Sequence, residues 1–349
     1  MNKMKYPTLK DVARLADTSI ATVSYVLNET KGRYITDELR QRVLDAAREL
    51  HYTKSLVASG LKGKSRKLFS LLVPQLSNIL FTNIALGIEE IAFESGYVMN
   101  ICNTFDNPNR EKEIIDQAIS QRVDGLLVCG TEWAFENLTP IQTYGIPFVA
   151  VERPLSVLDE SEYNFVGSNN LQAGAIAGRH LVEKGHRRLA YIEWMRNVIN
   201  VTNRRIGFET AISSHIDVGG SCFIRSSREL SAERGYQLTS QLLEAEAPTA
   251  ILYGHHVLAE GGVRCLRDMH LDIPGDISVI IIGLTDWSQM TIPPFTCVRQ
   301  PASEIGMAAA KLLIDIVESQ EHNPPGGSVQ RLLDCTLISR DTVKDLDAK

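Results

Sequence analysis

The side chains best suited to contact another molecule lie in one short segment near the start of the chain. They are mostly small, hydroxylated or amide-bearing, and such groups bond phosphate oxygens and the edges of bases. We expect four of them to hold phosphates, namely Ser19, Thr22, Ser24 and Asn28. We expect three to read base edges, namely Ile20, Ala21 and Tyr25. This set predicts an interface with double-stranded DNA.

Two short helices are needed to present these side chains. Apolar residues recur at helical spacing from Leu9 to Ala16, and Thr8 followed by Asp11 is typical of a capped helix start. After a short break, Ser19 can cap a second helix whose apolar face runs from Val23 to Leu27. Two helices joined by a tight turn, the second with small outer side chains, form the pattern of a DNA-binding helix-turn-helix. The alternative is a pair of ordinary surface helices in a bundle.

A third helix and a linker complete the N-terminal region. Thr36 can cap a helix with an acidic first turn, and the apolar face of that helix runs from Leu39 to Leu50. We therefore predict a three-helix DNA-binding headpiece at residues 1–53. Residues 54–67 follow as a linker that can form one or two helical turns, too short to be stable alone.

The positive charge is concentrated in this region. The chain of 349 residues has a formal charge of −6, yet residues 1–67 contain 14 Lys and Arg against 7 Asp and Glu. The remaining 282 residues therefore carry a net charge of −13. A basic N-terminal region followed by an acidic remainder fits a nucleic-acid contact confined to residues 1–67. A basic membrane-surface segment would need large apolar anchors on an amphipathic helix, and the sequence contains none.

Composition narrows the class of protein further. With 44% hydrophobic and 22% charged residues, the chain reads as an ordinary globular protein of two or three domains. It contains no apolar signal segment and no run long enough to span a membrane, so we expect a cytoplasmic location and no membrane partner. The six cysteines are scattered singly, which favours free thiols over zinc ligation or a disulfide framework.

Apolar runs alternate with helical patterns from residue 68 onward. Predicted strands are Leu68–Val73, Tyr97–Cys102, Gly125–Cys129, Pro147–Val151, Leu189–Ile192, Thr249–Tyr253 and Val279–Ile282. Predicted helices include Phe81–Glu94, Arg110–Gln121, Leu171–Lys184, Thr202–Ser214, Ser231–Glu244 and His256–Met269. This alternation predicts the α/β class, with two lobes built on doubly wound parallel sheets.

Candidate ligand-binding residues follow the predicted strands, because open α/β sheets bind ligands at the carboxyl ends of their strands. Phe81 follows the first strand and could offer its face to a ring, and Glu152 follows another. His255 and His256 are neighbours whose side chains would point apart on a helix, so we expect no metal site. The chain contains no Gly-x-Ser-x-Gly, Walker loop or His-Glu-x-x-His, and we expect neither catalysis nor a cofactor.

Two segments of the predicted headpiece carry a recognisable signature. They read Thr-Leu-Lys-Asp-Val-Ala-Arg-Leu-Ala from Thr8 and Ala-Thr-Val-Ser-Tyr-Val-Leu-Asn from Ala21. They closely resemble the LacI/GalR family of bacterial transcription regulators, and the resemblance continues through Gly185–Arg188, Asp276–Val279 and Ile292–Thr296. Asp17 stands where the family usually has a turn glycine, and Tyr25 stands where arginine is common. Because arginine is the usual reader of guanine, the preferred operator need not be the usual one.

The resemblance implies a role for the linker. The family uses this segment as a hinge helix, and two hinge helices pair across a dimer and push a leucine between base pairs in the minor groove. Leu61 matches that leucine, and Ala58 matches the small residue where the hinge helices touch. Gly60 lowers helix propensity by about 1 kcal/mol relative to alanine, so folding of the hinge is expected to depend on DNA.

The resemblance also implies a core like that of the periplasmic sugar-binding proteins, over residues 68–349. Its N-lobe would comprise about 68–167 and 298–328, and its C-lobe about 168–297 and 329–349. Arg204 matches the arginine with which the family commonly holds an effector. His255 stands where the family often has asparagine, and we expect it to make the response pH-sensitive near neutrality. Asp286 could replace a missing family aspartate only if its loop shifts.

These observations predict a sequence-specific transcription regulator, a repressor that acts as a homodimer on a roughly palindromic operator. A small polar effector, a sugar or sugar derivative, would change lobe closure and thereby bias the hinge. The predicted effector-binding residues are Phe81, Glu152, Arg204, His255 and Asp286. One alternative is a solute-binding protein, which the basic head and the missing export signal disfavour. Another is an enzyme that uses the cleft, which would require turnover of the bound ligand.

Overall fold

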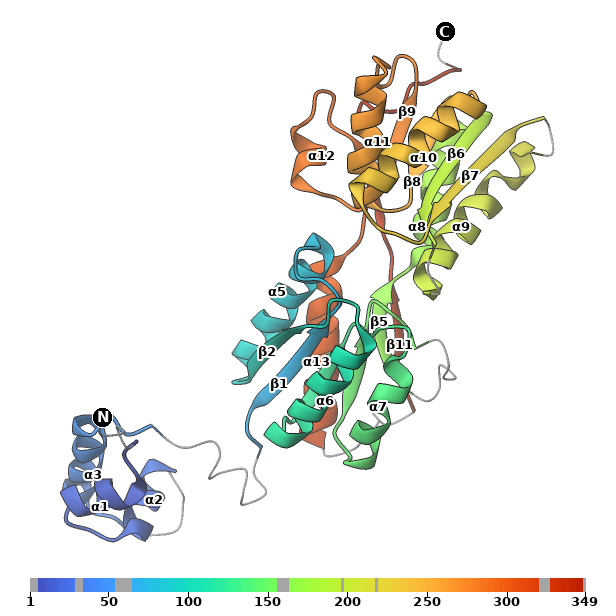
Figure 1. Cartoon of the computed structure of the whole chain (residues 1–349). Helices are drawn as coiled ribbons and strands as arrows, with labels where there is room; N and C mark the ends of the chain where they lie inside the picture. The colour runs from blue at the N-terminus through green and yellow to red at the C-terminus, as the bar shows by residue number, and fades with distance from the viewer. Residues whose placement is uncertain are drawn as a thin grey trace. The chain divides into compact units, whose positions relative to one another are not determined.

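The computed structural model describes residues 6–28, 34–53, 65–155, 163–195, 198–216, 219–319 and 327–347. The chain divides into two compact units, Met1–Arg66 and Lys67–Lys349. In Figure 1 the first is a group of short helices, and the second consists of two α/β lobes. Ala58 and Leu61, which the sequence places in a hinge helix, lie outside the described residues.

The first unit folds around a small apolar core. Helix α1 spans Leu9–Leu15, α2 spans Ile20–Leu27 and α3 spans Asp37–Glu49. Each helix contributes buried side chains at helical spacing, and the fully buried ones include Val12, Val23 and Val43. The three helices are those that the sequence predicts, and each begins directly after its predicted cap, Thr8, Ser19 or Thr36.

Side-chain caps fix the N-terminal ends of these helices. The hydroxyl of Thr8 accepts the amide hydrogen of Asp11, whose carboxylate accepts the amide hydrogen of Thr8 at 2.9 Å. Ser19 caps α2 and Thr36 caps α3 in the expected positions. Asp17, in the turn between α1 and α2, has a φ of 47°, a left-handed conformation that aspartate tolerates better than most residues. The turn therefore forms without the glycine that the family usually has there.

The N-lobe contains a parallel sheet with the strand order β11-β5-β4-β3-β1-β2 within the described residues. Its strands are β1 (Leu68–Val73), β2 (Val98–Asn103), β3 (Gly125–Val128), β4 (Phe148–Val151), β5 (Asn164–Ser168) and β11 (Gln330–Leu333). Its helices are α5 (Ile79–Glu94), α6 (Pro108–Gln121), α7 (Ala134–Thr143) and α13 (Ala302–Ser319). Apolar side chains of α5 and α13 pack on one face of the sheet, and those of α6 and α7 pack on the other.

The C-lobe repeats this plan with the strand order β12-β10-β9-β8-β6-β7 within the described residues. Its strands are β6 (Arg188–Trp194), β7 (Ser221–Ser227), β8 (Ala250–Tyr253), β9 (Ser278–Ile282), β10 (Thr296–Arg299) and the antiparallel β12 (Thr336–Ile338). Its helices are α8 (Asn170–Glu183), α9 (Ile199–Ile216), α10 (Ala232–Ala245), α11 (His256–Asp268) and α12 (Asp286–Met290). Side chains of α8 and α9 pack on one face, and those of α10 and α11 pack on the other.

The chain crosses between the lobes three times within the described residues. The first crossover follows β5 near residue 168, close to the predicted position. The second lies at residues 300–301, because β10 stays in the C-lobe sheet as far as Arg299. The prediction that the third lies near residue 328 is wrong, because β11 pairs with β5 in the N-lobe sheet and the chain leaves only after Leu333. The polar and exposed residues of β11 do not reveal which sheet it joins.

Glycines bring pairs of helices into close contact. A Cβ atom on Gly207 of α9 would overlap the carbonyl oxygen of Leu171 in α8, and one on Gly174 would overlap the carbonyl oxygen of Arg204. The same kind of contact joins α10 to α11 and α5 to α13, at Gly235, Gly261, Gly87 and Gly306. The α8–α9 contact matters most for function, since α9 carries Arg204.

No helix within the described residues is long and apolar enough to cross a membrane. The six cysteines, all in the part of the chain that the structure describes, are free thiols. Four of them are buried, namely Cys129, Cys265, Cys297 and Cys335.

Candidate functional site

The outer face of α2 carries the side chains that are predicted to read bases. Ile20 is 48% exposed and Ala21 is exposed, whereas Val23 and Val26 on the inner face are buried. Tyr25 is half-buried. The helix therefore leaves Ile20 and Ala21 accessible and Tyr25 partly accessible, and the contact of these residues with DNA stays a prediction.

The predicted phosphate-binding residues bond to one another along α2. The Oγ of Ser19 accepts the amide hydrogen of Thr22 at 3.0 Å and lies 2.9 Å from the Thr22 hydroxyl. The Nδ2 of Asn28 donates to the carbonyl oxygen of Ser24 at 2.6 Å and lies 3.1 Å from its hydroxyl. A hydroxyl has one donor and two acceptor positions, so these bonds fix the side chains without using their full capacity.

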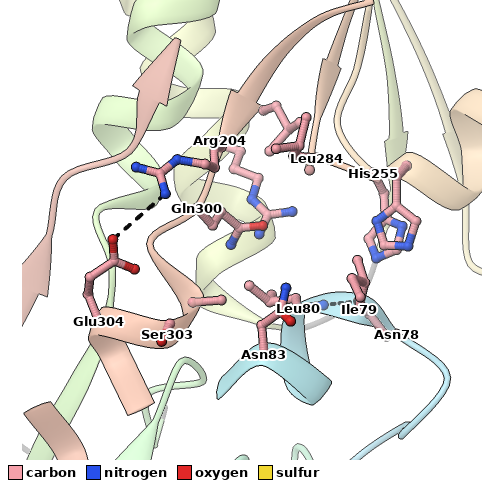
Figure 2. A pocket seen from close by; sticks show the side chains of 15 residues that line it. Asn78, Ile79, Leu80, Asn83, Arg204, His255, Leu284, Gln300, Ser303 and Glu304 are labelled. Carbon is pink, nitrogen blue, oxygen red and sulfur yellow. Dashed lines mark hydrogen bonds and ion pairs between the residues drawn. The ribbon is translucent and has the colours of Figure 1, made fainter. Parts of the chain in front are cut away.

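Two adjoining cavities lie between the lobes of the second unit, where the strands of both sheets end. The larger has a volume of about 300 Å³ and the smaller about 170 Å³. Asn78, Leu80, Arg204 and His255 line both. Figure 2 shows the smaller one. Asn78, the N-cap of α5, and Leu80 in the first turn of α5 face Arg204 and His255 of the other lobe. This is the position at which open α/β sheets bind ligands.

Arg204 reaches both cavities from α9 and is 5% exposed. Its Nε donates to Oδ1 of Asn170 at 2.7 Å, and its Nη1 donates to the carbonyl oxygen of Gly254 at 3.0 Å. Its Nη2 lies 4.0 Å from a carboxylate oxygen of Glu152. A guanidinium has five N–H groups, so the two hydrogen bonds orient Arg204 and leave further donors for a ligand.

Glu152 lies at the end of β4 and is buried, with 1% of its surface exposed. Its Oε2 accepts the amide hydrogen of Ser168 at 2.9 Å and the Ser168 hydroxyl at 2.8 Å. Its Oε1 accepts Nε2 of Gln300 at 2.9 Å. Ser168 leads into the first crossover and Gln300 lies in the second, so this carboxylate ties two crossovers together. Glu152 lines the larger cavity, and a direct contact with the ligand stays a prediction.

An ion pair supports the aromatic wall of the larger cavity. Phe81 lines this cavity, and the guanidinium carbon of Arg153 lies 5.7 Å from the centre of its ring. The Nη1 of Arg153 donates to Oδ1 of Asp106 at 2.8 Å and to the carbonyl oxygen of Gly130 at 3.2 Å. These bonds hold the guanidinium close to the ring, a favourable arrangement of a cation and a π-system.

His255 caps α11, and its ring is stacked on that of His256 with the ring centres 4.5 Å apart. Its Nδ1 accepts the amide hydrogen of Val257 at 3.2 Å, which places the proton of the neutral ring on Nε2. Burial lowers the pKa of His255 well below its usual range, and burial lowers the pKa of His256 to about 4. Nearby positive charge from Arg204 acts in the same direction on both pKa values. The expected pH response near neutrality therefore has no basis in His255.

Asp286 does not join the site. It begins α12, is exposed, and lines neither cavity. Strand β9 ends at Ile282, and the chain turns at Gly283, which has a φ of 108°. Asp286 follows this turn, so the assignment of Asp286 to the effector site is wrong, and the loop leaves Gly283 and Leu284 at the smaller cavity.

Several residues that line the larger cavity are not among those predicted from the sequence: Asp106, Trp194, Asn200 and Arg228. Trp194 ends β6, so its position beyond a predicted strand was a usable signal. Arg228 follows β7, which the sequence did not predict. Within the described residues, no group of three His, Cys, Asp or Glu is arranged to hold a metal ion.

Comparison with known proteins identifies the family. Residues 8–55 match the family model for bacterial regulatory proteins of the lacI family, and residues 179–343 match a periplasmic binding protein-like domain. The HTH-type transcriptional repressor PurR of Klebsiella pneumoniae (strain 342) is 32% identical over 320 residues, which are 90% of this chain and 92% of that protein. The chain belongs to the LacI family. This confirms the predicted resemblance, with its helix-turn-helix headpiece and two-lobed core.

Solved structures support the same fold. The lac repressor dimer bound to operator and the anti-inducer ONPF has a TM-score of 0.84 at 23% identity, covering 97% of this chain and 100% of that chain. A LacI family transcriptional regulator from Enterococcus faecium, with bound ribose, has a TM-score of 0.69 at 26% identity. That match covers 80% of this chain and all of the other.

Proposed function

We propose that this LacI-family repressor acts in the cytoplasm as a homodimer on a roughly palindromic operator, and that a sugar or sugar derivative controls it. The observation that carries the proposal is the combination of an accessible helix-turn-helix with a cavity lined from both lobes. The cavity offers an aromatic wall and several hydrogen-bonding side chains, which suits a ring with hydroxyl groups. The bound ribose of the Enterococcus faecium relative supports this class of effector.

Lobe closure is the step that links the cavity to DNA. Phe81 contributes to the cavity from the N-lobe and Arg204 from the C-lobe, so a ligand that touches both binds the closed lobes more tightly than the open ones. Only such a difference in affinity can shift the equilibrium between two conformations. The arrangement serves binding rather than turnover, and we propose no enzymatic activity.

Exposed apolar side chains support the dimer. Leu86 and Phe93 of α5 are 61% and 75% exposed, and Val98 and Ile101 of β2 are 63% and 45% exposed. Strand β2 is at the end of the N-lobe sheet. An exposed edge strand beside apolar side chains is typical of a surface that another molecule covers. A second copy of the chain would cover this surface, which we call the edge surface.

The proposal is tested by mapping the DNA bound by the full-length protein in its source genome. We expect a small number of sites with a shared, roughly palindromic sequence, and the binding of purified protein to that sequence should respond to one class of small polar molecule. Binding spread evenly over the genome would contradict sequence-specific regulation. A solute-binding protein would show no DNA binding at all.

Replacing Tyr25 by alanine is expected to weaken binding to the mapped operator by about 1–3 kcal/mol, and to weaken binding to random DNA much less. The reason is that a residue on the accessible side of α2 contributes to base reading, whereas phosphate contacts supply the affinity for any sequence. Fluorescence anisotropy with both DNAs measures the difference. Tyr34→Ala, which removes an exposed phenol outside α2, is the control. Equal losses on the two DNAs would remove Tyr25 from the specificity residues.

Replacing Phe93 by aspartate is expected to shift the protein from dimer to monomer, raising the dimer dissociation constant by about tenfold or more. A charge placed in the edge surface would have to be desolvated on association. Light scattering after gel filtration measures the mass. Tyr144→Asp changes an aromatic residue of similar exposure that follows α7, and it should leave the mass unchanged. A fully dimeric Phe93→Asp variant would argue against this surface.

The imidazole rings of His255 and His256 are expected to stay neutral from pH 8 down to about pH 6. Burial disfavours the charged ring, so protonation is postponed to lower pH and costs stability there, because the unfolded chain binds the proton more readily. The ring C–H resonances in a two-dimensional NMR titration report the charge of each ring. A midpoint near the ordinary histidine value of about 6.5 for either ring would contradict this prediction.

A further inference from the structure

Five charged side chains line the larger cavity within the described residues, and their charges do not balance. Three are arginines, namely Arg153, Arg204 and Arg228, and two are carboxylates, namely Asp106 and Glu152. His255 adds no charge, because burial lowers its pKa. The described residues of the cavity wall therefore carry one net positive charge before any ligand binds.

Both carboxylates are already bonded within the protein. Asp106 accepts Arg153 Nη1 at 2.8 Å and lies 3.5 Å from its Nη2. Glu152 accepts three hydrogen bonds from Ser168 and Gln300, and it lies 4.0 Å from Arg204. Two of the arginines are thus matched by the two acids, and the excess charge belongs to Arg228.

Arg228 is exposed at the edge of the cavity, on the loop that follows β7. Its carbonyl oxygen accepts Nε1 of Trp194 at 3.0 Å, so the backbone of the loop is held in place. Its guanidinium has no hydrogen bond or ion pair with any residue that the structure describes. The neighbouring acid, Glu229, is bonded to Arg234 and Ser231 instead. Arg228 therefore offers, at the edge of the cavity, a cation that no acid within the described residues neutralises.

Asn200 provides a second, independent indication of a ligand. It lies in the first turn of α9, lines the larger cavity and is 8% exposed. Its buried Oδ1 accepts no hydrogen bond within the described part of the chain. A buried amide oxygen without a partner is costly, and a hydroxyl group of a ligand would satisfy it.

We propose that the effector is a polyhydroxylated anion, a sugar acid or a sugar phosphate, whose charged group binds Arg228 and whose hydroxyl groups bind Asn200. The inference rests on the proposed function and names the ligand class of the same site. Arginine suits both anions, because its planar donors match carboxylate and phosphate oxygens. Neutral sugars would leave the charge of Arg228 unmatched.

The test compares neutral sugars with their anionic counterparts on the full-length protein. The pairs are glucose with gluconate, glucose with glucose 6-phosphate, galactose with galacturonate, and ribose with ribose 5-phosphate. Thermal shift identifies the anion that stabilises the protein, and calorimetry measures its Kd. We expect that anion to bind at least about tenfold more tightly than its neutral partner at low salt, and the difference to shrink as salt rises. Comparison of the sugar acids with the sugar phosphates shows whether the site prefers a carboxylate or a phosphate group.

Two variants assign the contacts. Arg228→Gln should raise the Kd of the anion about tenfold and leave the weak binding of the neutral sugar unchanged, whereas Arg228→Lys should retain part of the preference. Asn200→Ala should weaken both members of the pair. Arg187→Gln is the matched control, since Arg187 is an exposed arginine that precedes β6 at the opposite end of the strands.

Equal binding of neutral and anionic sugars, an unchanged anion Kd in Arg228→Gln, or no binding by any anion of the panel would overturn the proposal. These outcomes differ from a failure of the proposed function. A neutral sugar that binds tightly and alters operator affinity would retain the regulator and reject only the anion. Failure of the protein to bind selected sites in the genome would reject the regulator whatever the panel shows.

Discussion

Replacing Gly207 by alanine is expected to lower the free energy of unfolding of the core by about 2–3 kcal/mol. A Cβ atom at this position would overlap the carbonyl oxygen of Leu171, and that atom belongs to the backbone of α8. Alanine gains roughly 1 kcal/mol of helix propensity over glycine, but the helices can accept the new methyl group only by moving apart. The lost packing along the whole contact outweighs that gain. Because α9 also carries Arg204, the movement would displace its guanidinium from the cavities.

Urea unfolding followed by tryptophan fluorescence measures this effect on the core alone. The three tryptophans, Trp133, Trp194 and Trp287, all lie in the second unit. Thr210→Ala is the matched control, because Thr210 is an exposed position on the same helix and also becomes alanine. A Gly207→Ala variant that is as stable as the wild type would contradict the close contact of α8 and α9.

Most of the strands that the sequence predicts are buried on both faces of a sheet, and the exception is the edge strand β2, predicted as Tyr97–Cys102. Leu68–Val73 forms β1 with the predicted bounds, and Val279–Ile282 forms most of β9. Such strands are continuous apolar runs, and the sequence reveals them directly. The edge strands β7, β11 and β12 were not predicted, nor were β5 and β10 beside them. In β7 and β11, arginine and other polar residues interrupt the pattern, because one side of each strand meets solvent.

The candidate site could be predicted only where a residue follows a predicted strand or matches a family position. Phe81 and Arg204 meet one of these conditions, and both line the larger cavity. The pairing of Arg153 with Asp106 joins residues 47 positions apart, and no local pattern indicates it. The prediction that Asp286 joins the site was wrong for a related reason, since the left-handed turn at Gly283 redirects the loop before that residue. Contacts between residues far apart in the chain form only in the tertiary structure, so a single sequence does not reveal them.

The removal of Arg204 is expected to abolish most of the effector's influence on DNA binding while retaining DNA binding itself. In the wild type we expect the anion selected by thermal shift to change operator affinity by about tenfold or more. In Arg204→Ala we expect a change below about twofold, because the ligand loses the C-lobe group that lies on the wall of both cavities. A ligand that interacts equally with open and closed lobes cannot shift their equilibrium, however tightly it binds.

Two further variants separate this effect from a loss of folding. Arg205→Ala removes the neighbouring arginine, which pairs with Glu193 at 3.2 Å and lines neither cavity, so it should respond to the anion as the wild type does. Arg204→Lys keeps the charge but loses the planar fork that reaches Asn170 and Gly254 together, and should respond only partly. Operator affinity is measured by anisotropy for each variant with and without the anion. If Arg204→Ala responded as fully as the wild type, the closure of the lobes would have to be driven by other residues. The Glu152 carboxylate, which binds Ser168 and Gln300 of two crossovers, would then be the next group to replace.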